Sequence, residues 1–153
     1  LLSFSSYSDV PKIYNSVFRF YSKRSRFTAM GPRLESRALD LLDQLERFHK
    51  STGGKIKPDE VTFQLILKIF SDNGSFDAVE TILSRMKAFG LEPNENHYHT
   101  AMRPQSRADP IRNNENDTHL NAQSILQQVK EKYAKDGSAK PTTRMYTSCI
   151  SAI

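Results

Sequence analysis

The sequence is poor in cysteine and has no long hydrophobic run. Its single Cys149 cannot form an internal disulfide, and because it lies in an apolar stretch we predict a reduced core thiol rather than a reactive one, in a reducing compartment. No apolar run approaches the roughly 18 to 20 residues that span a bilayer, since Lys68 interrupts even FQLILKIF. The 6 glycines and 7 prolines gather at the joints between apolar segments. These shortages predict one almost entirely α-helical domain and no membrane partner.

Motifs for catalysis and metal binding are also missing. His97 and His99 form a His-x-His pair, but side chains two residues apart on a helix point about 200° apart. No cysteine or carboxylate cluster completes a zinc or nuclease site, and there is no phosphate-cradling glycine loop or paired-acid motif. Asp72 and Asp77 are better explained by a turn and by the start of the helix after it. We therefore expect no catalytic site, metal, cofactor or small-molecule substrate within this chain.

Apolar residues recur instead at helical spacing. Over residues 61–94, two such segments flank SDNG, whose Asp, Asn and Gly favour a turn. Gly90 follows the last apolar residue as a helix stop, and Pro93 favours the start of another helix. The segment is thus predicted to be a hairpin of two helices, about 34 residues long, which lies within the period of helical repeats.

The start of this hairpin recurs along the chain. KPDEVTFQ (57–64) is echoed by EPNENHYH (92–99) and KPTTRMYT (140–147), each with Pro, a polar residue and an aromatic residue four positions later. VPKIYN (10–15) matches the end of the pattern. The aromatic residues, each early in a predicted first helix, are Tyr14, Phe63, Tyr98 and Tyr146. Predicted second helices start at Ala38, Ala78 and Ala122. Unrelated hairpins of similar composition would not keep these features in one order.

We predict an α-solenoid of stacked antiparallel helix pairs, with about three repeats and part of a fourth. The expected repeats span approximately residues 11–59, 60–94, 95–142 and 143–153. The first and third are longer, and their extra residues fall in two places, between the two helices and near the end of the second. The predicted inter-helix insertions are 23–35 and 103–119. Because a solenoid unit buries its apolar face only against neighbours, we expect the chain to be an excerpt of a longer array.

The unit resembles a pentatricopeptide repeat, found in organelle proteins of eukaryotes. The resemblance rests on Val61-Thr62-Phe63, on Gly74 in the turn, on Met86 late in the second helix, and on Gly90-Leu91-Glu92-Pro93-Asn94 at the end of the unit; Val79 replaces the usual alanine. It covers nearly the whole chain. It implies sequence-specific binding of single-stranded RNA in organellar RNA metabolism (processing, stability, splicing or translation), in a mitochondrion or plastid.

The resemblance also implies which residues read the RNA bases. In the family, the residue after the first-helix aromatic and the residue after the closing Pro choose the base together. The corresponding pairs are Asn15 with Asp59, Gln64 with Asn94, His99 with Thr142, and Thr147 with a partner beyond the sequence. The first pair is the combination that the family associates with uracil, and the others depart from its code. As an alternative, these residues are polar helix starts, since Asp59 and Asn94 are also favourable N-caps.

Two further groups of residues are candidates for RNA contact. The residues two positions before each aromatic, which flank the base in the family, are Lys12, Val61, Asn96 and Arg144. Val61 would pack on a base, while Lys12 and Arg144 would stack or reach phosphate. The net charge of +5 and pI near 9.4 suit a polyanion. Much of the excess lies around the first insertion, a predicted basic loop that either contacts phosphate or is simply solvated: Arg19, Lys23, Arg24, Arg26, Arg33 and Arg37, against Glu35.

The main alternative is a protein-binding scaffold of tetratricopeptide type, for example within a ribosomal assembly. Such hairpins have a similar length, and the unusual base-reading pairs suit an array that packs against proteins. Salt separates the two hypotheses, because RNA binding weakens steeply with salt through counterion release. A hydrolase built on this chain is a third hypothesis. Some pentatricopeptide-like arrays are fused to nuclease or editing domains, so the resemblance leaves open an enzyme in the full-length protein.

Overall fold

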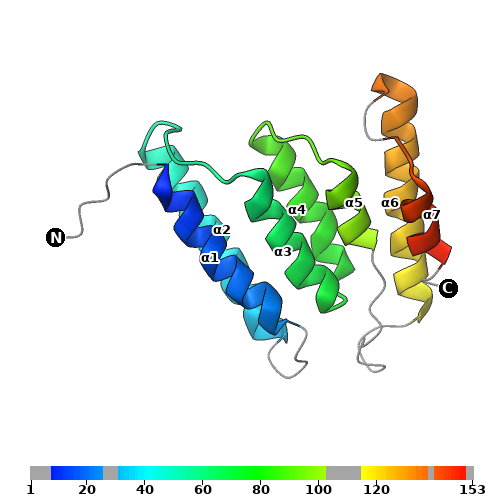
Figure 1. Cartoon of the computed structure of the whole chain (residues 1–153), viewed down its shortest axis with the longest axis horizontal. Helices are drawn as coiled ribbons and strands as arrows, with labels where there is room; N and C mark the ends of the chain where they lie inside the picture. Colours follow the sequence, from blue (N-terminus) through cyan, green and yellow to red (C-terminus); the bar gives the residue numbers. More distant parts are fainter. Residues whose placement is uncertain (1–7, 26–30, 103–114, 138–139, 151–153) are drawn as a thin grey trace.

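The computed structural model of the chain describes residues 8–25, 31–102, 115–137 and 140–150 (Figure 1). All secondary structure within these ranges is helical, which confirms the predicted all-α class. The helices are α1 (Asp9–Arg24), α2 (Gly31–Ser51), α3 (Glu60–Asp72), α4 (Phe76–Ala88), α5 (Glu95–Met102), α6 (Glu115–Asp136) and α7 (Thr143–Ile150).

The odd-numbered helices form a continuous row. Helix α1 contacts α3, α3 contacts α5, and α5 contacts α7. Each of α1, α3 and α5 also packs against the helix that follows it, and α4 meets α6. Figure 1 shows the row running from α1 and α2 at one end to α6 and α7 at the other. The starts of the odd helices are therefore brought close together, although they are far apart in the sequence.

One apolar core runs through the described helices. It contains the apolar positions that the helical spacing predicted, such as Phe63 and Ile66 of α3 and Met86 of α4, which have no exposed surface. Burying a side chain of this size stabilises the fold by about 1.5 to 3 kcal/mol. Cys149 is also buried, in agreement with a core thiol. The apolar stripes thus explain both the helices and their packing.

The predicted helix stop after α4 is confirmed. Gly90 has a φ of 72°, its N–H donates to the carbonyl of Lys87 at 2.9 Å, and the N–H of Leu91 reaches the carbonyl of Met86 at 3.2 Å. A Cβ atom added to Gly90 would meet nothing within 4 Å. The backbone conformation, rather than lack of space, therefore requires glycine here.

For the residues that the structure describes, the predicted loop at the first insertion is wrong. Lys23 and Arg24 belong to the last turn of α1, and Arg33 and Arg37 lie on α2, which begins at Gly31 instead of Ala38. Pro32 is tolerated because the first turn of a helix does not need its N–H group. Leu34, Ala38 and Leu42 then continue one buried stripe along α2. Arg26 lies outside the described residues.

Helix α6 is likewise longer than predicted, since it begins at Glu115 rather than at Ala122. Part of the second insertion is therefore additional helix. Asp72 closes a small polar cluster at the end of α3, where it accepts from Lys68 at 2.7 Å and from Ser25 at 3.2 Å. This agrees with the prediction that Asp72 has a structural role near the turn. Asp77 lies in the first turn of α4, as expected.

Polar contacts connect the even-numbered helices. Arg85 of α4 pairs with Glu46 of α2 at 2.6 Å and also with Asp43. Burial alone would lower the pKa of Arg85, but the hydrogen bonds to Asp43 and Glu46 raise it above its ordinary value. On the other side of α4, Gln128 of α6 donates to Glu80. Contacts at this degree of exposure contribute little stability each, so the apolar core carries most of it.

We predict that Phe63→Ala lowers the free energy of unfolding of the chain by about 3 to 5 kcal/mol, because it leaves a cavity in the centre of the core. Phe20→Ala is the matched control, since Phe20 is 52% exposed; its effect should stay within about 0.5 kcal/mol. Urea denaturation followed by circular dichroism measures both. Equal effects of the two substitutions would contradict the packing described above.

Candidate functional site

The predicted base-reading and base-flanking residues lie near the starts of the odd-numbered helices. A predicted reading residue directly precedes three of these helices: Asp59 before α3, Asn94 before α5 and Thr142 before α7. The other reading residues and the flanking residues lie within the first two turns of the odd-numbered helices. In every odd helix the flanking and reading residues are three positions apart, as in Val61 and Gln64, so both are on the same helix face. Because the helices stand in a row, these faces follow one another.

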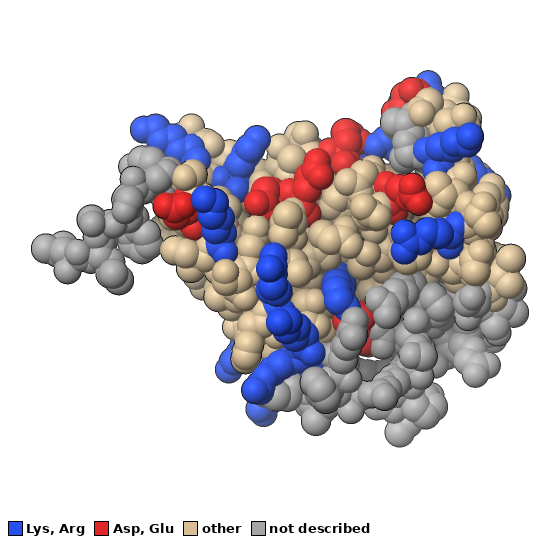
Figure 2. All heavy atoms as spheres, viewed as in Figure 1, with Lys and Arg blue, Asp and Glu red and all other residues tan. Residues whose placement is uncertain are grey.

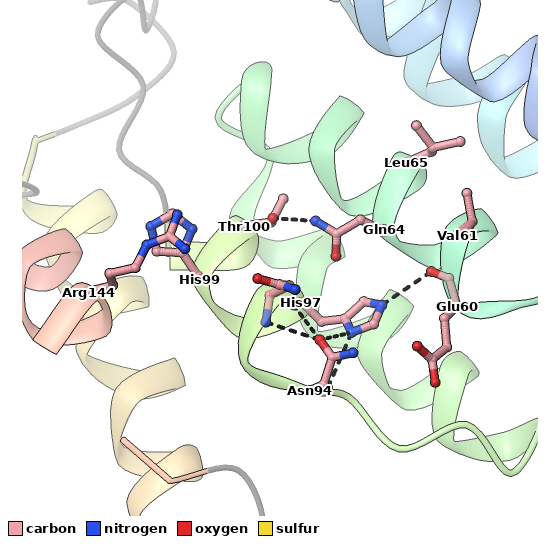
Figure 3. A pocket seen from close by; sticks show the side chains of 10 residues that line it. Glu60, Val61, Gln64, Leu65, Asn94, His97, His99, Thr100 and Arg144 are labelled. Atoms are coloured by element: carbon pink, nitrogen blue, oxygen red, sulfur yellow. Dashed lines mark hydrogen bonds between the residues drawn. The ribbon is translucent and has the colours of Figure 1, made fainter. Parts of the chain in front are cut away.

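A pocket of about 490 Å³ connects three of these helix starts (Figure 3). Helices α3, α5 and α7 contribute its walls. Six of the predicted contact residues line it: Val61, Gln64, Asn94, Asn96, His99 and Arg144. The remaining lining residues, which the sequence analysis did not single out as contacts, are Glu60, Leu65, His97 and Thr100. The pocket therefore combines apolar, amide and cationic groups in one place.

The first predicted pair is joined by hydrogen bonds. Asn15 Nδ2 donates to the carboxylate oxygens of Asp59 at 3.0 and 3.1 Å. Asn15 Oδ1 lies 2.7 Å from the hydroxyl of Thr62. Asp59 also caps α3, because its Oδ1 accepts from the N–H of Thr62 at 2.8 Å and its own N–H donates to Thr62 Oγ1 at 3.2 Å. Cap and predicted reading pair are thus one network.

The second predicted pair is arranged differently. Asn94 caps α5, since its Oδ1 accepts from the N–H groups of Asn96 at 3.0 Å and His97 at 3.3 Å. Gln64 is not bonded to Asn94 and instead donates from Nε2 to Thr100 Oγ1 at 2.6 Å (Figure 3). Within the described part of the chain, Gln64 Oε1 is buried with no hydrogen-bond partner. Each member of this pair is held by a different neighbour.

The third and fourth positions also depart from the first. Thr142 Oγ1 is buried and has no partner among the residues that the structure describes. His99 lines the pocket together with Arg144. Thr147 is exposed, and its hydroxyl donates to the carbonyl of Thr143 in its own helix at 2.9 Å. Only the first pair, Asn15 with Asp59, is directly bonded through side chains in the described ranges.

Three basic candidates lie away from the pocket. Lys12 is exposed and pairs with Asp9 at 3.0 Å. Lys23 and Arg24 are at the far end of α1, and the guanidinium of Arg24 lies 5.0 Å from the ring centre of Phe20. Arg24 lies nine positions after Asn15 on α1, which is about 13.5 Å along the helix axis. On the face drawn in Figure 2, basic side chains gather at the lower left, and acidic side chains lie mainly above them, so this face is not uniformly basic.

Thr62 and His97 belong to the site but were not predicted as parts of it. Thr62 has no exposed surface and is the third residue after the capping Asp59. That spacing is the signature of a capping box, so the sequence did contain a signal for it. His97 holds the equivalent position after Asn94, but nothing in the sequence indicated which partners its ring would take.

His97 is a core residue. Only 2% of it is exposed, and Nε2 lies 3.2 Å from the carbonyl of Glu60 while Nδ1 lies 2.7 Å from Asn94 Oδ1. Burial lowers the pKa of His97 below its ordinary value, although the carbonyl of Glu60 acts in the opposite direction. Among the residues that the structure describes, no three His, Cys, Asp or Glu side chains are grouped as a metal site would require.

No helix within the described ranges is both long enough and apolar enough to span a bilayer.

Comparison with known proteins finds a sequence similarity over part of the chain. An 89-residue stretch, 58% of the chain, is 29% identical to a chloroplastic pentatricopeptide repeat-containing protein of Arabidopsis thaliana, and it covers 15% of that protein's length. No family model matches the chain, and neither does any solved structure. Over this stretch the chain is thus similar to a pentatricopeptide repeat-containing protein, and the secondary structure of its described residues is helical.

We predict that acidification destabilises the chain in part through His97. The pKa of His97 is lower in the folded chain than its ordinary value of 6.5. At pH values between the lowered pKa and 6.5, the unfolded chain therefore binds more protons than the folded chain. Stability should therefore fall as the pH decreases from above 6.5 to the lowered pKa, and this contribution should level off below it. Thermal melts of wild type and His97→Gln at pH 8, 7, 6 and 5 measure the difference.

The control for this prediction is His99→Gln, which removes a histidine from the pocket instead of the core. It should keep the acid-dependent loss of the wild type, while His97→Gln should reduce it. An identical pH dependence for wild type and His97→Gln would show that His97 does not titrate as its burial implies.

Proposed function

We propose that this chain binds single-stranded RNA along the row of odd-numbered helices, as part of an α-solenoid of pentatricopeptide type. The observation that supports this most is the pocket between α3, α5 and α7, in which six predicted contact residues come together. They were selected from the sequence by their position in the repeat, without reference to any cavity. Residues 11–59, 60–94, 95–142 and 143–153 are the proposed repeats.

The chemistry of the pocket suits a nucleotide. Its volume lies in the range of about 300 to 1,000 Å³ that is usual for ligand pockets. Val61, 45% exposed, and Leu65 offer apolar surface for a base, and the exposed amide of Asn96 and the ring of His99 offer polar contacts. Arg144 supplies a cation for stacking or for phosphate. RNA recognition relies on this combination of stacking, hydrogen bonds to base edges and charge.

The proposed reading positions differ in quality. Asn15 and Asp59 hold one another in a defined geometry, so we expect base selection, for uracil, at this position. Gln64 and Asn94 are held by separate neighbours, so their position should tolerate several bases. We expect the position of His99 and Thr142 to tolerate several as well, because Thr142 is not tied to a reading partner within the described residues.

The wider role follows from the same proposal. The relative in Arabidopsis is named as chloroplastic, and we infer a mitochondrial or plastid site of action in RNA metabolism for this protein too. In that RNA metabolism, we infer that the residues of this chain bind RNA and do not catalyse a reaction. A protein-binding scaffold is the competing function, and the following experiment separates the two.

We predict that the full-length protein binds a random pool of single-stranded RNA more tightly than matching DNA and enriches a short motif. Affinity should fall with salt, with a slope of log K against log salt of about −0.7 for each phosphate contacted. Asn15→Ala should remove the preference at one base of the motif, whereas Gln64→Ala should change the motif little. Filter binding at two salt concentrations and sequencing of the bound pool measure these effects.

Salt-independent binding, or no preference for RNA at low salt with the two variants indistinguishable, would contradict this function. Either result would place the protein-scaffold hypothesis first.

We further predict that Arg144→Gln weakens binding of all RNA sequences alike and reduces the salt slope by about 0.7, because one phosphate contact is lost. Lys87→Gln is the matched control, since Lys87 is exposed on α4 and does not line the pocket. It should leave the slope close to that of the wild type. If both variants change the slope equally, net charge rather than the pocket determines binding.

A further inference from the structure

We infer that Thr62 is a positioning residue for the first base-reading pair: its hydroxyl fixes the direction in which the amide of Asn15 faces the RNA. This rests on the proposed function, because it concerns how that same site selects its base. Thr62 belongs to the helix after the proposed repeat of Asn15. The selectivity of one repeat would therefore depend on a side chain of the next.

The position of Thr62 between the two members of the pair supports this role. Its side chain has no exposed surface, and Asn15 is only 8% exposed. Thr62 Oγ1 lies 2.7 Å from Asn15 Oδ1 and 2.9 Å from Asp59 Oδ1, and it accepts from the N–H of Asp59 at 3.2 Å. The hydroxyl has a single hydrogen, so it can donate to only one of the two oxygens.

The hydrogen bonds determine which oxygen receives it. A carboxylate only accepts, so the amide nitrogen of Asn15, and not its oxygen, must face Asp59. The amide oxygen then points to Thr62, and the hydroxyl hydrogen is the donor within reach. Asp59 Oδ1 is already satisfied by the N–H of Thr62 and by Asn15. The amide of Asn15 is thus held at its nitrogen by Asp59 and at its oxygen by Thr62.

This orientation decides what the pair offers to a base. One hydrogen of Asn15 Nδ2 is used on Asp59, and the second is the donor that remains. Asp59 Oδ2 accepts from Asn15 and has a further lone pair. A donor beside an acceptor complements a carbonyl beside a ring N–H, as on the pairing edge of uracil. Cytosine has an acceptor at that ring nitrogen and would meet the carboxylate unfavourably.

The other junctions of the chain lack this arrangement. The residues equivalent to Thr62, three positions after Asn94 and Thr142, are His97 and Met145. His97 directs its ring to Asn94 and to the carbonyl of Glu60, and Gln64 turns to Thr100. Met145 is buried and has no hydroxyl to donate. The chain therefore contains internal comparisons for the role of Thr62.

The test uses the full-length protein with Thr62→Val, which replaces the hydroxyl by a methyl group, and Thr62→Ser, which keeps the hydroxyl. Affinities are measured for four RNAs that carry the wild-type motif and differ at the base whose selection Asn15→Ala abolishes. The preference for uracil over cytosine should fall about tenfold in Thr62→Val, as expected for one lost hydrogen bond, and should be retained in Thr62→Ser. Discrimination at the other motif positions should not change, which a purely structural role of Thr62 would not predict.

A second experiment does not depend on the stability of Thr62→Val. Gln64→Asn with Asn94→Asp places the same pair at the second junction, and adding His97→Thr completes the cluster there. The triple variant should prefer uracil at the second position more strongly than the double variant. Unchanged selectivity in Thr62→Val, or equal selectivity of the double and triple variants, would overturn the inference while RNA binding stands. Absence of RNA binding by the wild type would overturn both.

Discussion

Packing on both sides of α3 is the constraint on which the rest of the structure depends. This helix contacts α1, α2, α4 and α5, and its buried residues include Phe63, Ile66 and Phe70. An amphipathic helix with one apolar stripe could cover a single neighbour, but α3 is apolar on most of its circumference. Because α1 and α5 are held against opposite sides of it, the helix starts come into line, and the pocket follows from that line.

The cap of α3 connects this architecture to the proposed function. Asp59 ends the connection after α2, satisfies the free N–H of Thr62 and holds Asn15 of the neighbouring helix. The same carboxylate therefore contributes to helix stability, to the contact between α1 and α3, and to the face that RNA would meet. A substitution of Asp59 would alter all three of these contributions at once. Substitutions of Thr62 are more selective, since Thr62→Ser keeps the hydroxyl that completes the cluster.

Features that depend on residues close in sequence could be predicted, whereas contacts between different helices could not. Gly90 and the apolar spacing around Phe63 depend on residues close in sequence, and both predictions are confirmed. The start of α2 was missed because Gly31 and Pro32 resemble a turn, although a proline is equally compatible with a first helical turn. The partners of Gln64 depend on Thr100 from another helix, which no local pattern indicates. The repeat boundaries and the reading pairs remain predictions.

Crosslinking is the most direct test of the central claim that RNA lies along the starts of the odd-numbered helices. The full-length protein would be irradiated with RNA containing 4-thiouridine, and the crosslinked peptides identified by mass spectrometry. We expect crosslinks to peptides that contain residues 12–15, 59–65, 94–100 and 142–147, with few on α2, α4 and α6. Crosslinks confined to the even-numbered helices, or none above the level of an RNA-free control, would contradict it.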